Sequence, residues 1–405
     1  MTDTTGTVPT VSTRAGHRSE QIVRAATLLF QDLGYQNVSI DQIGAAVGLT
    51  GPAVYRHFKG KYEILVQALL AQVTHIEELT LRADTEGKTP QERLDLFLAG
   101  LSDVTANGDE ATLYRREQQH LNEADRERFQ DDFRINRDRI AAKITAADPE
   151  VTAYEAELLG FAVLTMYSNT PSIRGNLTPE RLIEIQIALA NAIVGCTLPP
   201  IDDDVQPAPS LITRRPAGRR ERILAASTIL FDERGFYDVR IDDIAKASEM
   251  SVATLYQHTT GKTQVLLAIL ERGAEGLLYV TAEALAQASN SAEVLDALID
   301  TYIEQAFGVH GRTMHILTAD LLYLSESEQA ALRATQREYV AEWVEAICDL
   351  SGQLGPSDSR ALAQAVIAVI TDVSQNPDLN CRPGIKAELS TLAHAMVLPP
   401  GLASA

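Results

Sequence analysis

The 405-residue sequence has few aromatic residues and few cysteines. Phe, Trp and Tyr make up 5% of it, so its interior must be built from Leu, Ile, Val and Ala, which suit packing between helices. The three cysteines, Cys196, Cys348 and Cys381, are odd in number and far apart. They offer neither a disulfide framework nor metal-ligand spacing, which favours a reducing cytoplasm and predicts no metal and no cofactor.

Signals for a membrane or for catalysis are also missing. Residues 1–16 are rich in threonine and have no apolar core, so we expect a disordered N-terminal arm and not a signal peptide. The longest apolar run, around Ala361–Ile370, is too short to cross a bilayer. No Gly-rich phosphate loop, paired-carboxylate signature or nucleophile elbow appears. The sequence therefore predicts a cytoplasmic protein without catalytic residues and without a membrane partner.

A long internal repeat is the dominant feature that the sequence does contain. Residues 22–61 and 223–262 align without a gap, with 15 of 40 positions identical. The two halves also end alike, in Leu-Pro-Pro at 198–200 and 398–400. A period of about half the chain indicates two copies of one whole domain and not a solenoid.

Each copy has the pattern of three short helices. Apolar residues from Ile22 to Phe30 recur at helical spacing, which predicts the first helix. Ser39 with Gln42 has the pattern of a capping box at the start of a second helix. Thr50 begins a third helix after a tight turn. The order predicts a helix-turn-helix unit.

Longer helical stretches follow each copy, and no alternating strand pattern appears, so we expect an all-α fold of two similar halves. Breaks at proline and glycine predict body helices at 61–83, 90–106, 109–120, 123–146, 151–169 and 179–196, and at 262–288, 291–307, 310–324, 326–351, 357–375 and 384–397. The expected domains are the arm (1–16), a first helix-turn-helix head (17–61), a first body (62–197), a Pro-rich linker (198–218), a second head (219–262) and a second body (263–400).

Residues around the third helix of each copy suit contact with DNA. Short side chains let a helix lie deep in the major groove, while cations and hydroxyls contact phosphates. The N–H groups at the start of the second helix also suit a phosphate. The candidates are Ser39, Thr50, Gly51, Pro52, Ala53, Tyr55, Arg56, His57 and Lys61 in the first copy, and Arg240, Ser251, Val252, Ala253, Thr254, Tyr256, Gln257, His258 and Lys262 in the second. For the tyrosines and histidines, core packing at a helix end is the alternative.

The run IDQIGAAVGLTGPAVYRHFKGK and its second copy resemble the DNA-binding domain of TetR-family transcriptional regulators. The resemblance covers about 90 residues and implies a DNA head followed by a ligand-binding, dimerising body in each half. Family members usually work as homodimers, so the resemblance implies that this chain is its own pseudo-dimer on double-stranded DNA. The fused arrangement more loosely resembles tandem members of the mammalian-cell-entry operon repressor type.

The second copy departs from the family pattern at three positions. Thr259 replaces Phe58, the aromatic residue behind the recognition helix. Glu249 replaces Gly48, and we expect it to adopt a left-handed backbone at a cost of roughly 1 kcal/mol. Arg240 loses the cap that a serine provides but offers a phosphate partner. The sequence leaves open whether the second head binds DNA; if it does, its different recognition residues predict a different half-site.

Charge is distributed unevenly along the chain. The net charge is −20, yet residues 14–61 carry +3 and residues 214–262 carry +2. Positive heads permit a nucleic-acid partner, and negative bodies repel stray contacts with DNA. A window of this length can also reach +3 by chance.

The body sequences indicate a ligand only in outline. Arg115, Arg116 and His120 either contact an acidic ligand or stay at the surface. The abundance of Leu, Ala and Ile fits a small apolar effector, and the resemblance to tandem members suggests a lipid-like one. We expect a ligand-responsive repressor whose two halves pair within one chain on an imperfect palindrome. The alternative is a ligand-binding or protein-interaction module whose second head has lost specific DNA binding.

Overall fold

The computed structural model describes residues 11–107, 113, 117, 120–200, 216–308 and 311–402, and helices are the regular structure of these residues. No strand occurs in these ranges, which confirms the expected all-α fold. Contacts between Cα atoms divide the chain into two compact units. The first unit contains residues 1–78 and 109–133, and the second contains 79–108 and 134–405.

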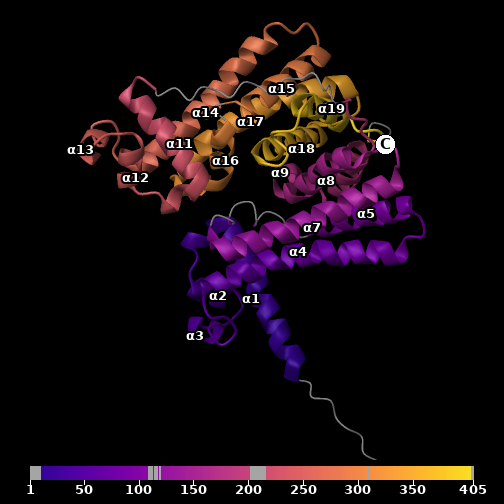
Figure 1. Cartoon of the computed structure of the whole chain (residues 1–405), viewed down its shortest axis with the longest axis horizontal. Coiled ribbons are helices and arrows are strands. Elements are labelled where there is room, and N and C mark those ends of the chain that lie inside the picture. The colour runs from indigo at the N-terminus through magenta and orange to yellow at the C-terminus, as the bar shows by residue number, and fades with distance from the viewer. Residues whose placement is uncertain are drawn as a thin grey trace, which may run out of the picture. The chain divides into compact units, whose positions relative to one another are not determined.

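The first head belongs to the first unit (Figure 1). Its elements are α1 (Val11–Leu33), the short 3-10 helix η1 (Tyr35–Asn37), α2 (Ile40–Ala46) and α3 (Gly51–Val54), and the connecting helix α4 (Lys61–Glu86) begins in this unit and ends in the second. Phe30, Ile43 and Val54 are fully buried and form the core that holds the three head helices together. Gly34 has φ 81°, so α1 ends at the glycine that the sequence indicates.

The helix α1 begins earlier than expected. Residues 11–16 are helical, which corrects the expectation that the disordered arm extends to residue 16. No proline stands between Val11 and Leu33, so nothing in the sequence prevents the helix from starting there.

The second head repeats this architecture within the second unit. Its elements are α11 (Arg219–Asp238), α12 (Ile241–Ala247), α13 (Val252–Leu255) and α14 (Lys262–Leu285). Gly235 interrupts α11 with φ 74° and ψ 155°, at the position that matches Gly34. The two copies therefore share a positive-φ glycine that turns the chain from the first head helix toward the second.

The body helices lie close to the predicted ranges. The first body adds α5 (Pro90–Asn107), α7 (Glu123–Ala147), α8 (Ala153–Ser168), α9 (Thr170–Arg174) and α10 (Pro179–Val194). The second adds α15 (Ser291–Ala306), α16 (Gly311–Asp320), the short 3-10 helix η4 (Leu321–Tyr323), α17 (Glu326–Ser351), α18 (Pro356–Gln375) and α19 (Ile385–Val397). The prediction missed α9 because Pro171 was taken as a break, whereas proline is tolerated in a first helical turn. Most of the predicted helix 109–120 lies outside the described residues.

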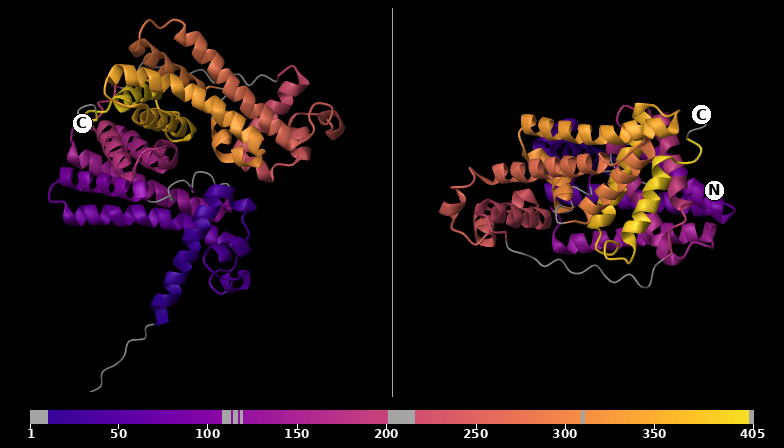
Figure 2. Two further views of the ribbon diagram at one scale, coloured as in Figure 1. Left: turned by 180° about the vertical axis from the view of Figure 1, so that it is seen from behind. Right: turned by 90° about the horizontal axis from the view of Figure 1, so that it is seen from above.

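Within the second unit, α18 packs against α8 and α9, and α10 packs against α18 and α19 (Figures 1 and 2). Asn169 Nδ2 donates to Asp372 Oδ2 at 3.1 Å. The Arg181 guanidinium donates to both carboxylate oxygens of Asp358, at 3.2 and 2.8 Å. Of the described helices, none is both long and apolar enough to cross a bilayer.

Candidate nucleic-acid interface

The first recognition helix, α3, exposes only part of its predicted contact set. Thr50, Pro52 and Arg56 are exposed, and 58% of Tyr55 is accessible to solvent. Gly51 is buried, and a Cβ at this position would clash with the Asp41 carboxylate. Gly51 thus lets α3 approach α2 closely, and the surface available to DNA is formed by its neighbours. Ala53 and His57 are half-buried beside them.

The second recognition helix, α13, is better capped and presents a similar surface. Ser251 Oγ accepts a hydrogen bond from the Thr254 backbone N at 3.1 Å. Val252 is half-buried against the head core, so only part of its side chain is available to a thymine methyl group. Tyr256 is 54% exposed, close to the value for its counterpart in α3. The other exposed candidates here are Ala253, Gln257 and His258.

The second helix of each head begins differently in the two copies. Ser39 Oγ accepts from the Gln42 backbone N at 3.2 Å, and the Ser39 N donates to Gln42 Oε1 at 2.8 Å, so the predicted capping box is present. In the second head, the Arg240 backbone N donates to Asp243 Oδ2 at 2.9 Å, and its side chain provides no cap. The Arg240 side chain is exposed at this helix start, whereas the Ser39 hydroxyl is already engaged by Gln42.

The departures of the second copy have the structural consequences expected of them. Glu249 has φ 55°, and it is the sole non-glycine residue with positive φ in the described chain. Gly48 has φ 68° at the matching position of the first head. Phe58 is buried in the first core, whereas Thr259 is buried with hydrogen bonds from its Oγ1 to the Gly261 carbonyl (2.9 Å) and Gln264 Oε1 (3.0 Å).

Two lysines predicted as phosphate contacts are occupied inside the heads. Lys61 Nζ donates to the backbone carbonyls of Tyr35, Gln36 and Val38 at 2.8, 3.4 and 2.8 Å. Lys262 makes the matching three bonds in the second head at 2.6, 3.1 and 2.7 Å. An ammonium group has three donors, so both are fully used. Burial lowers the pKa of both lysines. This geometry corrects the expectation that they are simple phosphate contacts: each one fastens the loop that follows the positive-φ glycine.

A buried acid from the body, which was not predicted from the sequence, also holds this loop in each half. The Glu117 carboxylate accepts from the Tyr35 backbone N at 3.2 Å, and the Asp320 carboxylate accepts from the Phe236 backbone N at 3.1 Å. The residue three positions after each acid also contacts the loop. The signal in the sequence is an acid and a ring three residues apart, repeated at a spacing near that of the heads.

His120 and Tyr323 are these ring residues. The His120 ring lies 5.2 Å from the Tyr35 ring, and its Nδ1 is 3.3 Å from Gln36 Nε2. Tyr323 stacks on Phe236 at 5.1 Å. His120 is therefore part of the junction between head and body, which corrects its assignment as a ligand residue. Arg115 and Arg116 lie outside the described residues.

The second junction contains a carboxyl group with an unusual proton affinity. Burial raises the pKa of Asp320 to about 7, against the opposing effects of the Phe236 N–H, His315 and Lys262, and the Asp232 carboxylate raises it further. Asp232 itself is held by His315 at 2.7 Å. Near neutral pH, Asp320 is thus divided between its charged and neutral forms.

Comparison with known proteins places these heads in a family. The model of the bacterial regulatory proteins of the tetR family matches residues 22–68 and 223–269. The HTH-type transcriptional activator FasR of Mycolicibacterium smegmatis is 26% identical over 165 residues, or 41% of this chain and 74% of FasR. The regulator SrpR of Pseudomonas putida is 42% identical over 65 residues, or 16% of this chain and 30% of SrpR. A solved TetR-family regulator from Bordetella parapertussis aligns with 45% of this chain and 93% of its own, with 21% identity and a TM-score of 0.40.

The two matched segments coincide with the two three-helix heads, so the fold and the site define a helix-turn-helix DNA-binding protein. The DNA-binding domain of the tetR family therefore occurs twice in this chain.

Replacing either half-buried lysine tests its assignment as a structural clamp. Lys61→Ala and Lys262→Ala should each destabilise their head by roughly 2–3 kcal/mol, because three carbonyls lose a charged donor. Thermal unfolding followed by circular dichroism measures the loss. Lys59→Ala, which removes an exposed cation two residues away, is the matched control and should leave the melting temperature unchanged. If Lys61→Ala leaves the melting temperature unchanged and reduces the salt dependence of DNA binding, Lys61 contacts a DNA phosphate and is not a structural clamp.

Glycine at position 249 should relieve the strained backbone of the second head. We expect Glu249→Gly to raise stability by about 0.5–1 kcal/mol, since relief of the left-handed strain exceeds the entropy that glycine adds to the unfolded chain. Gly48→Ala should cost about 1 kcal/mol, because no atom lies near its Cβ and the backbone angle alone opposes the change. Urea unfolding of both variants measures the two effects; a loss of stability in Glu249→Gly would show that its side chain contributes more than its backbone costs.

Asp320 predicts a pH dependence of the second head. Its folded pKa of about 7 exceeds the ordinary value of 3.8, so the folded state holds the proton more tightly and stability falls as pH rises from about 4 to 7. Asp320→Asn should mimic the neutral form and gain up to about 4 kcal/mol over the wild type above pH 7, but little near pH 4. Melting temperatures from pH 4 to 8 measure the difference, with the exposed acid Asp242→Asn as control. A constant difference across this range would contradict the assignment.

Proposed function

We propose that this regulator is a ligand-responsive repressor whose single chain binds one operator with both heads. Two half-sites on successive major grooves of one DNA face would have centres roughly 34–36 Å apart. The recognition residues differ between Thr50-Gly51-Pro52 and Ser251-Val252-Ala253, so the operator would be an imperfect palindrome. Repression and a cytoplasmic location are proposed from the family resemblance, as is a kinship with the mammalian-cell-entry operon repressor type.

The preserved surface of the second head is the observation that carries this proposal. Tyr55 and Tyr256 protrude to nearly the same degree at the end of their recognition helices, although neither is needed for the head core. The lysine clamp is also kept in both copies. Retention of both features supports DNA contact by the second head, despite its strained turn.

Pairing of the two halves within one chain is supported by which helices meet in the second unit. The last long helices of each half, α8 and α10 in one and α18 and α19 in the other, face each other. Contact between equivalent elements is the pattern of a two-fold interface. Arg382, which is 4% exposed, reaches Glu157 at 3.8 Å, and Arg137 reaches Asp378 at 3.5 Å. Both arginine side chains are largely buried, whereas Glu157 and Asp378 are 34% and 66% exposed, so these pairs favour one register of the helices more than they add stability.

The proposal is tested on DNA that flanks the gene of this protein. Footprinting should show one protected site, and light scattering on the minimal duplex should give one chain per duplex. Tyr55→Ala and Tyr256→Ala should each weaken binding about tenfold or more, while Tyr279→Ala, an exposed tyrosine of the body, should not.

Three outcomes separate the alternatives. Two chains on the minimal duplex would overturn the pseudo-dimer but leave DNA binding intact. Loss of binding in Tyr55→Ala alone would support a second head that has left the DNA. Absence of any specific footprint would favour the ligand-binding or protein-interaction module. A reporter gene under the footprinted promoter decides between repression and activation.

A further inference from the structure

Buried aromatic and hydroxyl side chains form a cluster in the core of the second body. They come from four helices: Thr281 of α14, Tyr302 of α15, Tyr339 and Trp343 of α17, and Thr371 of α18. All five are at most 5% exposed. The three ring centroids lie 5.9–6.5 Å from one another. Such a concentration of aromatic rings is unusual in a chain with a single tryptophan and 5% aromatic residues.

Three polar atoms of this aromatic cluster have no hydrogen-bond partner. They are Thr281 Oγ1, Tyr339 Oη and Trp343 Nε1. Burial raises the pKa of the Tyr339 phenol far above its ordinary value, while the polar groups of Trp343 and Thr281 beside it lower it. The three groups converge on one place, but by distance and angle none of them is hydrogen-bonded. Buried polar groups in proteins are nearly always paired, so three orphans at one place indicate a missing partner.

Polar groups in the first body are arranged differently. Ser102 Oγ and Tyr167 Oη are 2.9 Å apart, and Tyr167 also donates to the Leu98 carbonyl at 2.9 Å. Gln186 Nε2 donates to Thr105 Oγ1 and Thr170 Oγ1 at 3.1 and 2.8 Å. These hydroxyls satisfy one another, so they leave no position for an external partner. The contrast lies between these two groupings, since the Tyr154 hydroxyl elsewhere in the first body is also without a partner.

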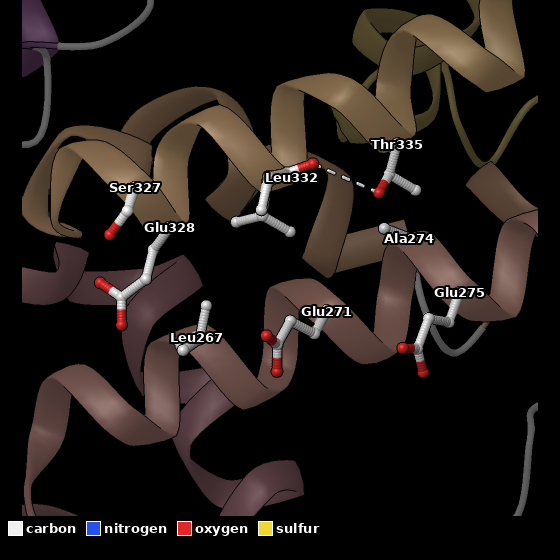
Figure 3. Close-up of a pocket in the computed structure, with 9 residues that line it drawn as sticks. Leu267, Glu271, Ala274, Glu275, Ser327, Glu328, Leu332 and Thr335 are labelled. Carbon is white, nitrogen blue, oxygen red and sulfur yellow. Dashed lines mark hydrogen bonds between the residues drawn. The ribbon is translucent and has the colours of Figure 1, made fainter.

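The seam between α14 and α17 extends along both helices from Thr281 and Tyr339 of the aromatic cluster. Its outer part is a groove of about 300 Å³, where Leu267, Glu271 and Ala274 of α14 face Glu328, Leu332 and Thr335 of α17 (Figure 3). Tyr339 follows Thr335 by one helical turn, and Thr281 follows Ala274 by two, so the groove and the cluster share the facing stripes of these helices.

The chemistry of the seam restricts what it can hold. The cluster offers an indole N–H and two hydroxyls but no charged group, which suits a hydrogen-bond acceptor on an uncharged apolar molecule. The groove carries the carboxylates of Glu271, Glu275 and Glu328. These repel anions such as fatty acids and acyl thioesters.

From this arrangement we propose that the α14–α17 seam of the second body binds a flat, uncharged aromatic molecule through a carbonyl-like acceptor, which Tyr339 and Trp343 recognise. The proposal deepens the proposed function, because it names the class of effector and assigns it to one of the two bodies. Binding of this molecule can be measured in the absence of DNA, so the two proposals can be tested separately.

A matched set of naphthalenes tests the site in the full-length protein. The probes are 2-acetylnaphthalene, which has the acceptor, naphthalene, which lacks it, and 2-naphthoate, which is anionic. Binding is followed by the fluorescence lifetime of Trp343, the single tryptophan. We expect saturable binding of 2-acetylnaphthalene, about fivefold to tenfold weaker binding of naphthalene, and no binding of 2-naphthoate.

Two variants connect the binding to the orphan groups. Tyr339→Phe should weaken 2-acetylnaphthalene about fivefold to tenfold and leave naphthalene unchanged, whereas Tyr167→Phe in the first body should change neither. Equal affinity of Tyr339→Phe and wild type for the ketone, or tighter binding of 2-naphthoate, would overturn the site. A ketone that binds but does not alter operator affinity would keep the site and refute its effector role. If the chain binds no operator, the proposed function is refuted. The lifetime titration would still show whether the seam binds the ketone.

Discussion

A lysine at the first position of the connecting helix holds each DNA-binding head in shape. The positive-φ glycine that ends the first helix is followed by a short loop whose carbonyls lie outside the hydrogen-bond ladder of that helix. Lys61 and Lys262 satisfy these carbonyls, and a buried acid, Glu117 or Asp320, takes a loop N–H from the other side. A buried charge is tolerated only when its donors and acceptors are used in this way. The position of the recognition helix depends on this clamp, because the loop leads directly into the helix-turn-helix.

The duplicated heads show which parts of the unit can change. Thr259 exchanges the buried ring of the first copy for two short hydrogen bonds, and Glu249 keeps the backbone of the turn without glycine. Glu249 lies in the turn before the recognition helix and Thr259 lies behind that helix. The exposed tyrosine and the lysine clamp are kept in both copies. The second copy has therefore diverged in how it is stabilised more than in the surface that it presents.

Local rules were enough to predict the elements but not the polar contacts between them. The helix boundaries follow from capping residues, glycine and proline, because these act on neighbouring residues. The short helix α9 was not predicted, because proline ends a helix when it stands in the interior but is tolerated in the first turn. The lysines were misassigned because a cation beside a recognition helix suits a phosphate and a carbonyl equally well. Burial decides between the two, and the buried acid Glu117 lies 82 residues from the loop that it contacts. The aromatic cluster of the second body is built from four helices, which no local pattern connects.

The helix α14 gives the second body a physical connection to its head. The same helix begins with the clamp residue Lys262 and carries Thr281 of the aromatic cluster near its other end. A molecule that entered the seam with α17 and shifted α14 along its axis would also displace Lys262 from its three bonds to loop carbonyls. A ligand changes DNA affinity only by preferring one of two arrangements of such an element. In the first half, the paired hydroxyls of Ser102 and Tyr167 favour a single arrangement. The two heads would then respond unequally to one effector, with the second head as the one that the ligand controls.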